Sequence, residues 1–297
     1  MKIVIAGGTG FLGKALQKYF SEKNNEVFIL TRNPKQPDEI YWDAVYLGEW
    51  TEILEQADVL INLTGKCVDC RYTDENRKAI LESRVKSTEV LQKAINLCKN
   101  PPDVWLNSSS ATIYVHAETQ LMDEDNGVIG DDFSMNICKN WEQAFFADNS
   151  VPIRKVALRT SIVLGNEGGG FPKMKMISRL GLGGKQGNGQ QMMSWIHEKD
   201  FCRAVEFIIE HQELTKKVNI TTPNPLKNED FMKHLRQSIG MPIGINSPVF
   251  LLEMASLFIR TETELLLKSR NVYPKRLLEN GFKFEFPTIN QAFADLN

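Results

Sequence analysis

The glycine-rich segment AGGTGFLG (residues 6–13) constrains the fold of this chain more than any other stretch. It follows the apolar run KIVIA (2–6) directly and opens a stretch from about Phe11 to Ser21 that has helical periodicity. Glycines at this spacing allow a tight strand-to-helix turn, a close backbone approach to a pyrophosphate and close helix packing. We interpret the segment as a dinucleotide-binding turn whose helix N-terminus binds the pyrophosphate, with a plain tight turn as the alternative.

Alternating strands and helices continue through the first two-thirds of the chain. Apolar runs separated by helices are typical of a parallel sheet that is covered on both faces. Strands are expected at 2–6, 27–31, 58–64, 104–110 and 154–165, and helices at 11–21, 74–99 and 131–146.

The character of the sequence changes after Gly165. Glycine-rich stretches at 168–171 and 181–189 predict a long loop system, which in a compact domain tends to be functional. Further on we expect a helix at 201–211, a strand at 218–222, a helix with Asn228 as N-cap, a buried helix at 248–259 and a half-buried strand at 282–286. The run at 248–259 is too short to span a bilayer.

Composition limits the classes of partner and the cellular location that are expected for this chain. The 297 residues include 35 basic and 37 acidic ones, interspersed, so we expect no nucleic-acid partner and no membrane partner. Five cysteines, an odd number, in a chain that begins without a secretory pattern predict free thiols and a cytoplasmic location. Cys67 and Cys70 form a lone C-x-x-C, for which a metal or redox role is the minor alternative, and no metal site is expected.

The end of the second expected strand discriminates between cofactors. An NAD site would place an acid there for the ribose 2′-hydroxyl, whereas an NADP site places an arginine near the 2′-phosphate. This chain has Thr31, Arg32 and Asn33, with no acid before Asp38. The planar fork of Arg32 matches a phosphate, so we predict NADP(H), with a solvated surface arginine as the alternative.

Three further segments carry candidate site residues. INLTGK (61–66) and SSSATIY (108–114) end strands at the sheet edge where ligands bind, and Ser110 there can hydrogen-bond a substrate oxygen. The alternatives are a plain strand-to-loop turn and a local Ser/Thr turn, respectively. WIHEKD (195–200) places His197 before a helix, where a structural histidine is the competing interpretation.

Several of these blocks together resemble the extended short-chain dehydrogenase/reductases, the NAD(P)-dependent epimerase and dehydratase superfamily. The matching blocks are AGGTGFLG, SSSATIY and LRTSIVLG (158–165). A closer resemblance is to the atypical epimerase-like subfamily with a C-terminal domain of unknown function. Its blocks here are 62–65, 82–91, 138–144, 181–200, 224–231 and 273–288.

The resemblance implies an α/β fold, a Rossmann-type doubly wound parallel sheet with a smaller C-terminal α+β substrate domain. The expected NADP-binding domain comprises 1–165 and 199–218, and the substrate-side domain comprises 166–198 and 219–297. Many relatives are dimers, so a homodimer is an expectation by analogy. The residues expected at the cofactor are Gly7, Thr9, Gly10, Phe11, Leu12, Gly13, Thr31, Arg32, Leu63, Thr64, Gly65 and Arg84.

The helix at 131–146 departs from the superfamily pattern. The superfamily uses a tyrosine as general acid/base and a lysine four residues later, and a glutamate commonly lies four residues past that lysine. If Glu142 is this glutamate, the lysine position holds Cys138 and the tyrosine position holds Ser134. A serine hydroxyl has a pKa far above that of tyrosine, about 10, and a thiol brings no positive charge. The standard mechanism is therefore not expected.

Two hypotheses follow for the function. The first is an NADP(H)-dependent oxidoreductase or epimerase of altered mechanism, acting on a nucleotide sugar or a small carbonyl compound. In it Ser110 orients the reacting oxygen, and Tyr114, Cys138, His197 or a water handles the proton. The second is a non-catalytic NADP(H)-binding sensor or scaffold protein, which the missing Tyr-Lys pair favours.

Overall fold

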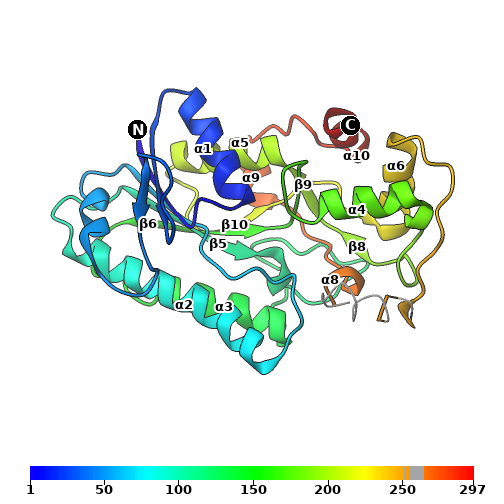
Figure 1. Cartoon of the computed structure of the whole chain (residues 1–297), viewed down its shortest axis with the longest axis horizontal. Helices are drawn as coiled ribbons and strands as arrows, with labels where there is room; N and C mark the ends of the chain where they lie inside the picture. The colour runs from blue at the N-terminus through cyan, green and yellow to red at the C-terminus, as the bar shows by residue number, and fades with distance from the viewer. Residues whose placement is uncertain (251, 254–263) are drawn as a thin grey trace.

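A seven-stranded parallel sheet organises the chain, as a computed structural model shows for residues 1–250, 252–253 and 264–297 (Figure 1). The strand order is β10-β6-β5-β4-β1-β2-β3, and each neighbouring pair is parallel. This is the Rossmann order, which reverses direction between β1 and β4 and opens a crevice there. The strands are β1 (Lys2–Ala6), β2 (Glu26–Thr31), β3 (Glu39–Tyr41), β4 (Val59–Asn62), β5 (Val104–Ser110), β6 (Arg154–Thr160) and β10 (Lys216–Ile220).

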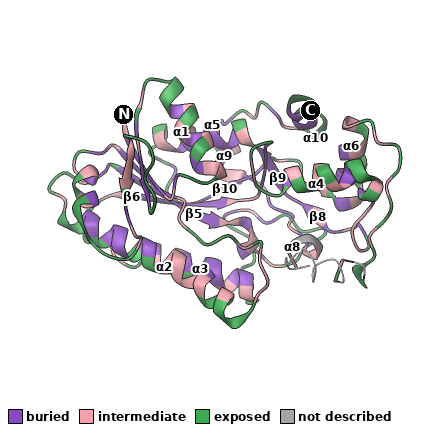
Figure 2. Ribbon diagram, in the orientation of Figure 1, coloured by how far each residue is buried: buried purple, intermediate pink, exposed green. Residues whose placement is uncertain are grey.

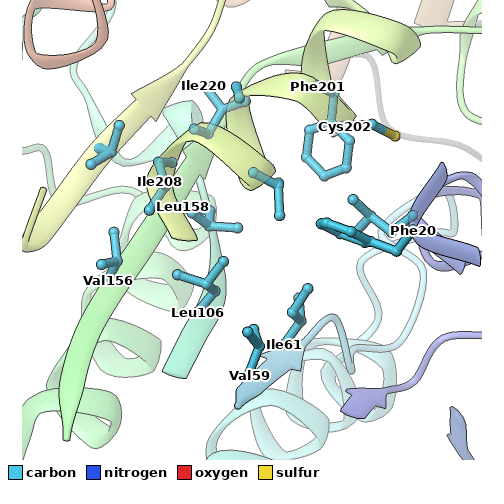
Figure 3. Packing of buried hydrophobic residues seen from close by; sticks show 14 of the residues in the cluster. Phe20, Val59, Ile61, Leu106, Val156, Leu158, Phe201, Cys202, Ile208 and Ile220 are labelled. Carbon is cyan, nitrogen blue, oxygen red and sulfur yellow. The ribbon is translucent and has the colours of Figure 1, made fainter. Parts of the chain in front are cut away.

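Helices cover both faces of the sheet. One face carries α1 (Phe11–Glu22) and α5 (Glu198–Glu210), and the other carries α2 (Asp74–Leu97) and α3 (Phe133–Phe146) (Figure 1). Alternate residues of β1 therefore enter different cores. One core holds Ile3 and Ile5, and the other holds Val4 and Ala6 (Figure 3 shows part of the first). The inward faces of these helices are buried, as Figure 2 shows.

A smaller lobe follows the sheet. It joins the sheet region through β7 (Ile162–Leu164), which pairs in parallel with β9 (Trp195–His197). Its core holds Phe171, Trp195, Phe231 and Phe293. The other elements that the structure describes are η1 (Glu49–Leu54), η2 (Ala111–Ile113), α4 (Phe171–Ile177), η3 (Ser178–Leu182), β8 (Met192–Met193), β11 (Leu226–Lys227), α6 (Asn228–Ser238), α8 (Glu264–Leu267), α9 (Lys275–Glu279) and α10 (Ile289–Leu296). Within the described ranges, no helix combines the length and apolar character needed to cross a bilayer.

Several boundaries differ from those that the sequence predicts. The strand expected at 154–165 divides at Ser161, whose N–H donates to Ile220 O (3.1 Å), so β6 pairs with β10 and β7 pairs with β9. The loop system expected at 165–189 contains α4 and η3. β10 spans Lys216–Ile220, whereas the sequence predicts the strand at 218–222. The helix expected at 248–259 lies largely outside the described residues.

The strand predicted at Phe282–Phe286 is wrong. It has strand-like alternation, with Phe282 and Phe286 buried, but it belongs to no strand. The buried carboxylate of Asp200 takes the place of a neighbouring strand, accepting from Glu285 N (2.9 Å) and Phe286 N (2.8 Å). Arg203 completes the connection by donating to Lys283 O (2.9 Å) and to Asp200.

The prediction that Asn228 is an N-cap is wrong. It is the first residue of α6, and Lys227 is the N-cap. The Asn228 side chain is buried and accepts from Gln186 N (2.9 Å), so it fixes the preceding loop to α6.

Asp200→Ala should destabilise the protein by about 3 kcal/mol, because it leaves the backbone N–H groups of Glu285 and Phe286 without their acceptor and removes the carboxylate partner of Arg203. Urea unfolding followed by circular dichroism measures the change in unfolding free energy. Glu285→Ala is the matched control, since its side chain is exposed in the same segment, and should stay within about 0.5 kcal/mol. Equal stability of the two variants would show that Asp200 does not hold the segment.

Candidate functional site

The glycine turn after β1 is packed tightly against its surroundings. Gly7 has a φ of 72°, and a Cβ there would lie 2.9 Å from Thr64 Cα. A Cβ on Gly13 would lie 2.2 Å from Gly8 O, inside any allowed contact. Glycine is therefore required at both positions, and the first turn of α1 rests directly on the turn that precedes it.

The N-terminus of α1 is open by contrast. Gly10 is its N-cap, no side chain caps the helix, and its first turn holds no acidic residue. A Cβ added at Gly10 would meet no atom of the described residues within 4 Å. Thr9 is exposed beside it, and Phe11 and Leu12 are partly buried behind it. The first-turn amides and the positive end of the helix dipole therefore fit an anion such as a pyrophosphate.

The end of β4 forms the second wall of this crevice. Leu63 N donates to Ala6 O (2.9 Å), which holds the strand end against β1, and Thr64 N donates to Asn62 Oδ1 (3.0 Å) within the strand end itself. Thr64 Oγ1 is buried, and the described residues offer it no hydrogen-bond partner. A buried hydroxyl is normally bonded, so this atom fits a site that a ligand or water completes.

Arg84 of α2 lies against the loop that follows β4. Its Nη1 donates to Ile80 O (2.9 Å) and Lys66 O (3.1 Å), and its guanidinium lies 5.1 Å from the Trp141 ring centroid. A Cβ on Gly65 would come within 3.0 Å of this guanidinium, so the glycine makes room for it. The hydrogen bonds described for Arg84 thus brace the loop, although the side chain adjoins the crevice.

The end of β2 presents a free cation. Thr31 is buried, whereas Arg32 is exposed and forms no hydrogen bond or ion pair with any residue that the structure describes. The first acid after the strand, Asp38, accepts from Gln17 Nε2 (2.6 Å) and is occupied there. The arrangement fits a 2′-phosphate better than a 2′-hydroxyl.

The end of β5 carries the serines. Ser110 Oγ accepts from Thr112 N (3.2 Å) and lies 3.0 Å from Thr112 Oγ1, so it caps η2 and remains partly exposed. Ser109 points to the other side of the strand and donates to Glu142 Oε1 (2.6 Å). Ser110 is partly exposed at the end of the strand and is therefore available to a ligand in the crevice.

A buried polar network lies behind this strand end. Glu142 of α3 accepts from both Nε (2.8 Å) and Nη2 (2.7 Å) of Arg159 on β6. Arg159 Nη1 donates to the Tyr114 hydroxyl (2.8 Å), which donates to Asn219 Oδ1 (2.9 Å). This bidentate pair was missed by sequence reasoning, although an arginine inside an apolar strand at 154–160 was a usable signal.

Tyr114 is a member of that network. Its side chain has no exposed surface, and its hydroxyl has both a donor and an acceptor. Burial raises the pKa of the phenol above its usual value. These contacts hold η2, β6 and β10 together and leave the phenol without exposed surface.

Ser134 and Cys138 lie on the α3 face at the expected positions. Ser134 Oγ donates to Glu264 Oε1 (2.9 Å), a contact with the smaller lobe. Cys138 is buried beside Ala111 of η2 and Val272. Burial raises the pKa of the thiol to about 12, so it is neutral at physiological pH. Neither group reproduces a tyrosine paired with a cation.

His197 lies elsewhere, under α10. It is fully buried and is the N-cap of α5, where Nδ1 accepts from Lys199 N (3.1 Å). Its ring stacks on Phe286 at 4.0 Å, and Nε2 lies 3.3 Å from Asp295 Oδ2. Burial lowers the pKa of the imidazole to about 4, so the ring is neutral at pH 7. These contacts describe a structural histidine.

The cysteine pair in the loop after β4 carries no visible metal arrangement. Cys67 is exposed and Cys70 partly buried, and both are free thiols. Across 1–250, 252–253 and 264–297, no three histidine, cysteine or acidic side chains gather in a way that could hold a metal ion.

The structure thus divides the predicted residues into three places. The glycine turn, 63–65 and Arg84 meet at one crevice, and Arg32 lies at the end of the adjoining strand. Ser110, Ser134 and Cys138 lie around η2 and α3, beside that crevice. Tyr114 and His197 are engaged in separate structural contacts.

Comparison with known proteins places these features in a family. Residues 3–221 match the NAD dependent epimerase/dehydratase family, and residues 247–296 match a domain of unknown function, DUF1731. The chain is 30% identical over 300 residues to the epimerase family protein SDR39U1 of Bos taurus, covering 100% of this chain and 99% of the relative. It is 29% identical to the epimerase family protein YfhF of Bacillus subtilis (strain 168), covering 100% and 98%.

Solved structures show the same fold. The crystal structure of human epimerase family protein SDR39U1 (isoform 2) with NADPH superposes with a TM-score of 0.91 at 30% identity, covering 100% of this chain and 99% of that one. A nucleoside-diphosphate sugar epimerase from Corynebacterium glutamicum gives 0.82 at 26% identity, and the match spans 58% of that longer chain.

Two glycine variants separate the roles within the turn. Gly10→Ala should keep wild-type stability, because its Cβ meets open space, but should weaken dinucleotide binding at least 10-fold, because that space is the crevice. Gly13→Ala should cost about 2 kcal/mol of unfolding free energy through its clash with Gly8. Thermal unfolding and titration with NADPH measure both effects. Unchanged NADPH affinity in Gly10→Ala would show that the crevice is not the binding site.

Proposed function

This chain belongs to the NAD dependent epimerase/dehydratase family, and from that premise we propose that it is an NADP(H)-dependent oxidoreductase or epimerase. Its substrate in this proposal is a nucleotide sugar or a small carbonyl compound. The smaller lobe, 166–198 with 219–297, is proposed as the substrate side.

The open N-terminus of α1 is the observation that carries the cofactor proposal. The pyrophosphate fits over Gly10, where the helix is uncapped and a Cβ would meet open space. Arg32 is free to bind the 2′-phosphate. Thr64 Oγ1 is a buried hydroxyl that has no hydrogen-bond partner among the described residues, so it can bond to the cofactor. A relative with 30% identity has been crystallised with NADPH, which supports the same choice of cofactor.

The proposed chemistry uses few groups of this chain. NADP(H), when bound, supplies or accepts the hydride. Ser110 is partly exposed at the end of β5 and orients the reacting oxygen by a hydrogen bond. Because Tyr114 and His197 are buried in other contacts and Cys138 is a neutral thiol, we assign the proton to a water molecule beside Ser110.

A second function, an NADP(H)-binding sensor or scaffold without chemistry, is favoured by one specific observation. The α3 face that carries the acid/base pair in the superfamily holds Ser134, which is bonded to Glu264, and Cys138, whose pKa is about 12. Neither can exchange a proton readily at physiological pH. In this alternative, cofactor binding changes the affinity for another protein.

Two further properties stay proposals. A cytoplasmic location rests on the five cysteines, all of them free thiols. A homodimer rests on analogy with the superfamily.

Arg32→Ala should weaken NADPH binding at least 30-fold and NADH binding less than threefold, because only NADPH carries the 2′-phosphate. Titrations followed by nicotinamide fluorescence measure both dissociation constants. Lys35→Ala is the control, since Lys35 is an exposed cation on the same loop, and should change neither constant by more than about twofold. An equal loss for NADPH and NADH in Arg32→Ala would remove the phosphate assignment.

Stereospecifically deuterated NADPH separates the two functions. The enzyme should transfer or exchange one of the two C4 hydrogens when incubated with a panel of carbonyl compounds and nucleotide sugars, and Ser110→Ala should slow this at least 10-fold. Mass spectrometry of the recovered cofactor and products gives the isotope distribution. Tight NADPH binding with complete retention of deuterium across the panel, for both the 4R-labelled and the 4S-labelled cofactor, would favour the sensor.

A further inference from the structure

Arg270 lies where the smaller lobe meets α3, and its backbone is fixed there. Its N–H donates to Met192 O (2.8 Å), and its carbonyl accepts from Ser194 Oγ (2.6 Å). The same Ser194 Oγ accepts from Val272 N (2.8 Å). The start of the side chain is therefore held in place by the segment that contains β8 and β9.

The surroundings of Arg270 include the α3 face already described. Val272, two residues on, packs in one buried cluster with Cys138 of α3 and with Ala111, which directly follows Ser110. On the other side, Ser269 N donates to His116 Nδ1 (3.1 Å). The segment thus joins the smaller lobe to the region where Ser110, Ser134 and Cys138 lie.

The guanidinium of Arg270 keeps most of its hydrogen-bonding capacity. Arginine has five N–H donors, and the bond described for this one is Nη1 to Ser269 O (3.1 Å), with no ion pair to any described residue. By contrast, Arg159 binds Glu142 and Tyr114, and Arg154 donates to several backbone carbonyls. Arg270 is partly buried, so its remaining donors have reduced access to bulk solvent and gain from an acceptor that a ligand supplies.

Neighbouring carboxylates are occupied by another cation. Lys268 forms ion pairs with both Asp132, the N-cap of α3, and Glu264. Glu264 also accepts from Ser134 Oγ (2.9 Å). The contacts of the two acids are to Lys268, to Ser134 and, for Asp132, to Met135 N (2.9 Å). Among the described residues, neither acid therefore engages the planar fork of Arg270, which is available to a ligand.

We propose that Arg270 binds an anionic group of the substrate, a carboxylate or a phosphate, close to the reacting carbon. It thereby supplies from the smaller lobe a positive charge that α3 lacks at Cys138. A guanidinium fork binds either anion with two parallel hydrogen bonds, so it would orient the substrate as well as attract it. The inference deepens the proposed function and rests on the crevice being the cofactor site.

The test is a calorimetric titration of the NADPH-saturated protein with inorganic phosphate and, separately, with oxalate at constant ionic strength. We expect one saturable site for at least one anion, weakened at least 10-fold in Arg270→Gln. Arg270→Lys should weaken it at least fivefold, because it keeps the charge but loses the fork. Arg179→Gln, an exposed arginine of the same lobe, should bind like wild type. The preferred anion identifies the substrate group as phosphate or carboxylate.

Wild-type affinity in Arg270→Gln, or no saturable binding of either anion to the wild type, would overturn the inference. If Arg270→Gln does not fold, unchanged affinity in Arg270→Lys overturns it instead. The NADPH dissociation constant, measured in parallel, keeps the two proposals separate. Normal NADPH binding without an anion site removes Arg270 and leaves the cofactor proposal intact. Anion binding to a protein that does not bind NADPH removes the cofactor proposal and leaves Arg270 as an anion site.

Discussion

The direct contact between the turn after β1 and the first turn of α1 is the constraint on which the rest of the site depends. A single added carbon at Gly13 would lie 2.2 Å from Gly8 O, and one at Gly7 would lie 2.9 Å from Thr64 Cα. Because three chain segments meet there without side chains between them, the helix N-terminus faces the crevice at close range. The anion-binding geometry thus follows from the absence of Cβ atoms rather than from any catalytic group.

The second organising interaction is the buried pair of Glu142 and Arg159. It joins α3 to β6 and, through the Tyr114 hydroxyl, to Asn219 of β10. A charged pair that is removed from water must satisfy its remaining donors and acceptors, and this one does so with Ser109 and Tyr114. The network therefore fixes α3, which carries Ser134 and Cys138, against the sheet, and it holds the Tyr114 hydroxyl in buried contacts.

Much of the fold was predictable because its signals are local. The apolar run at 104–110 became β5 with the expected bounds, and the amphipathic stretch from Phe11 became α1. The errors arose where a distant residue competes with local pattern. Phe282–Phe286 alternates like a strand, but Asp200 binds its backbone from 85 residues away. Asn228 has the chemistry of an N-cap, yet its side chain is taken by Gln186.

The sequence by itself determined the glycine turn, the arginine that follows β2 and the absence of a tyrosine–lysine pair from α3, since each depends on residue type and spacing along one short segment. The tertiary structure alone decided the environment of the other polar groups. Tyr114 meets Asn219 across 105 residues, and Ser134 meets Glu264 across 130. Burial and hydrogen-bond partners set the charge state and availability of such groups, and both are properties of chain segments brought together only by folding.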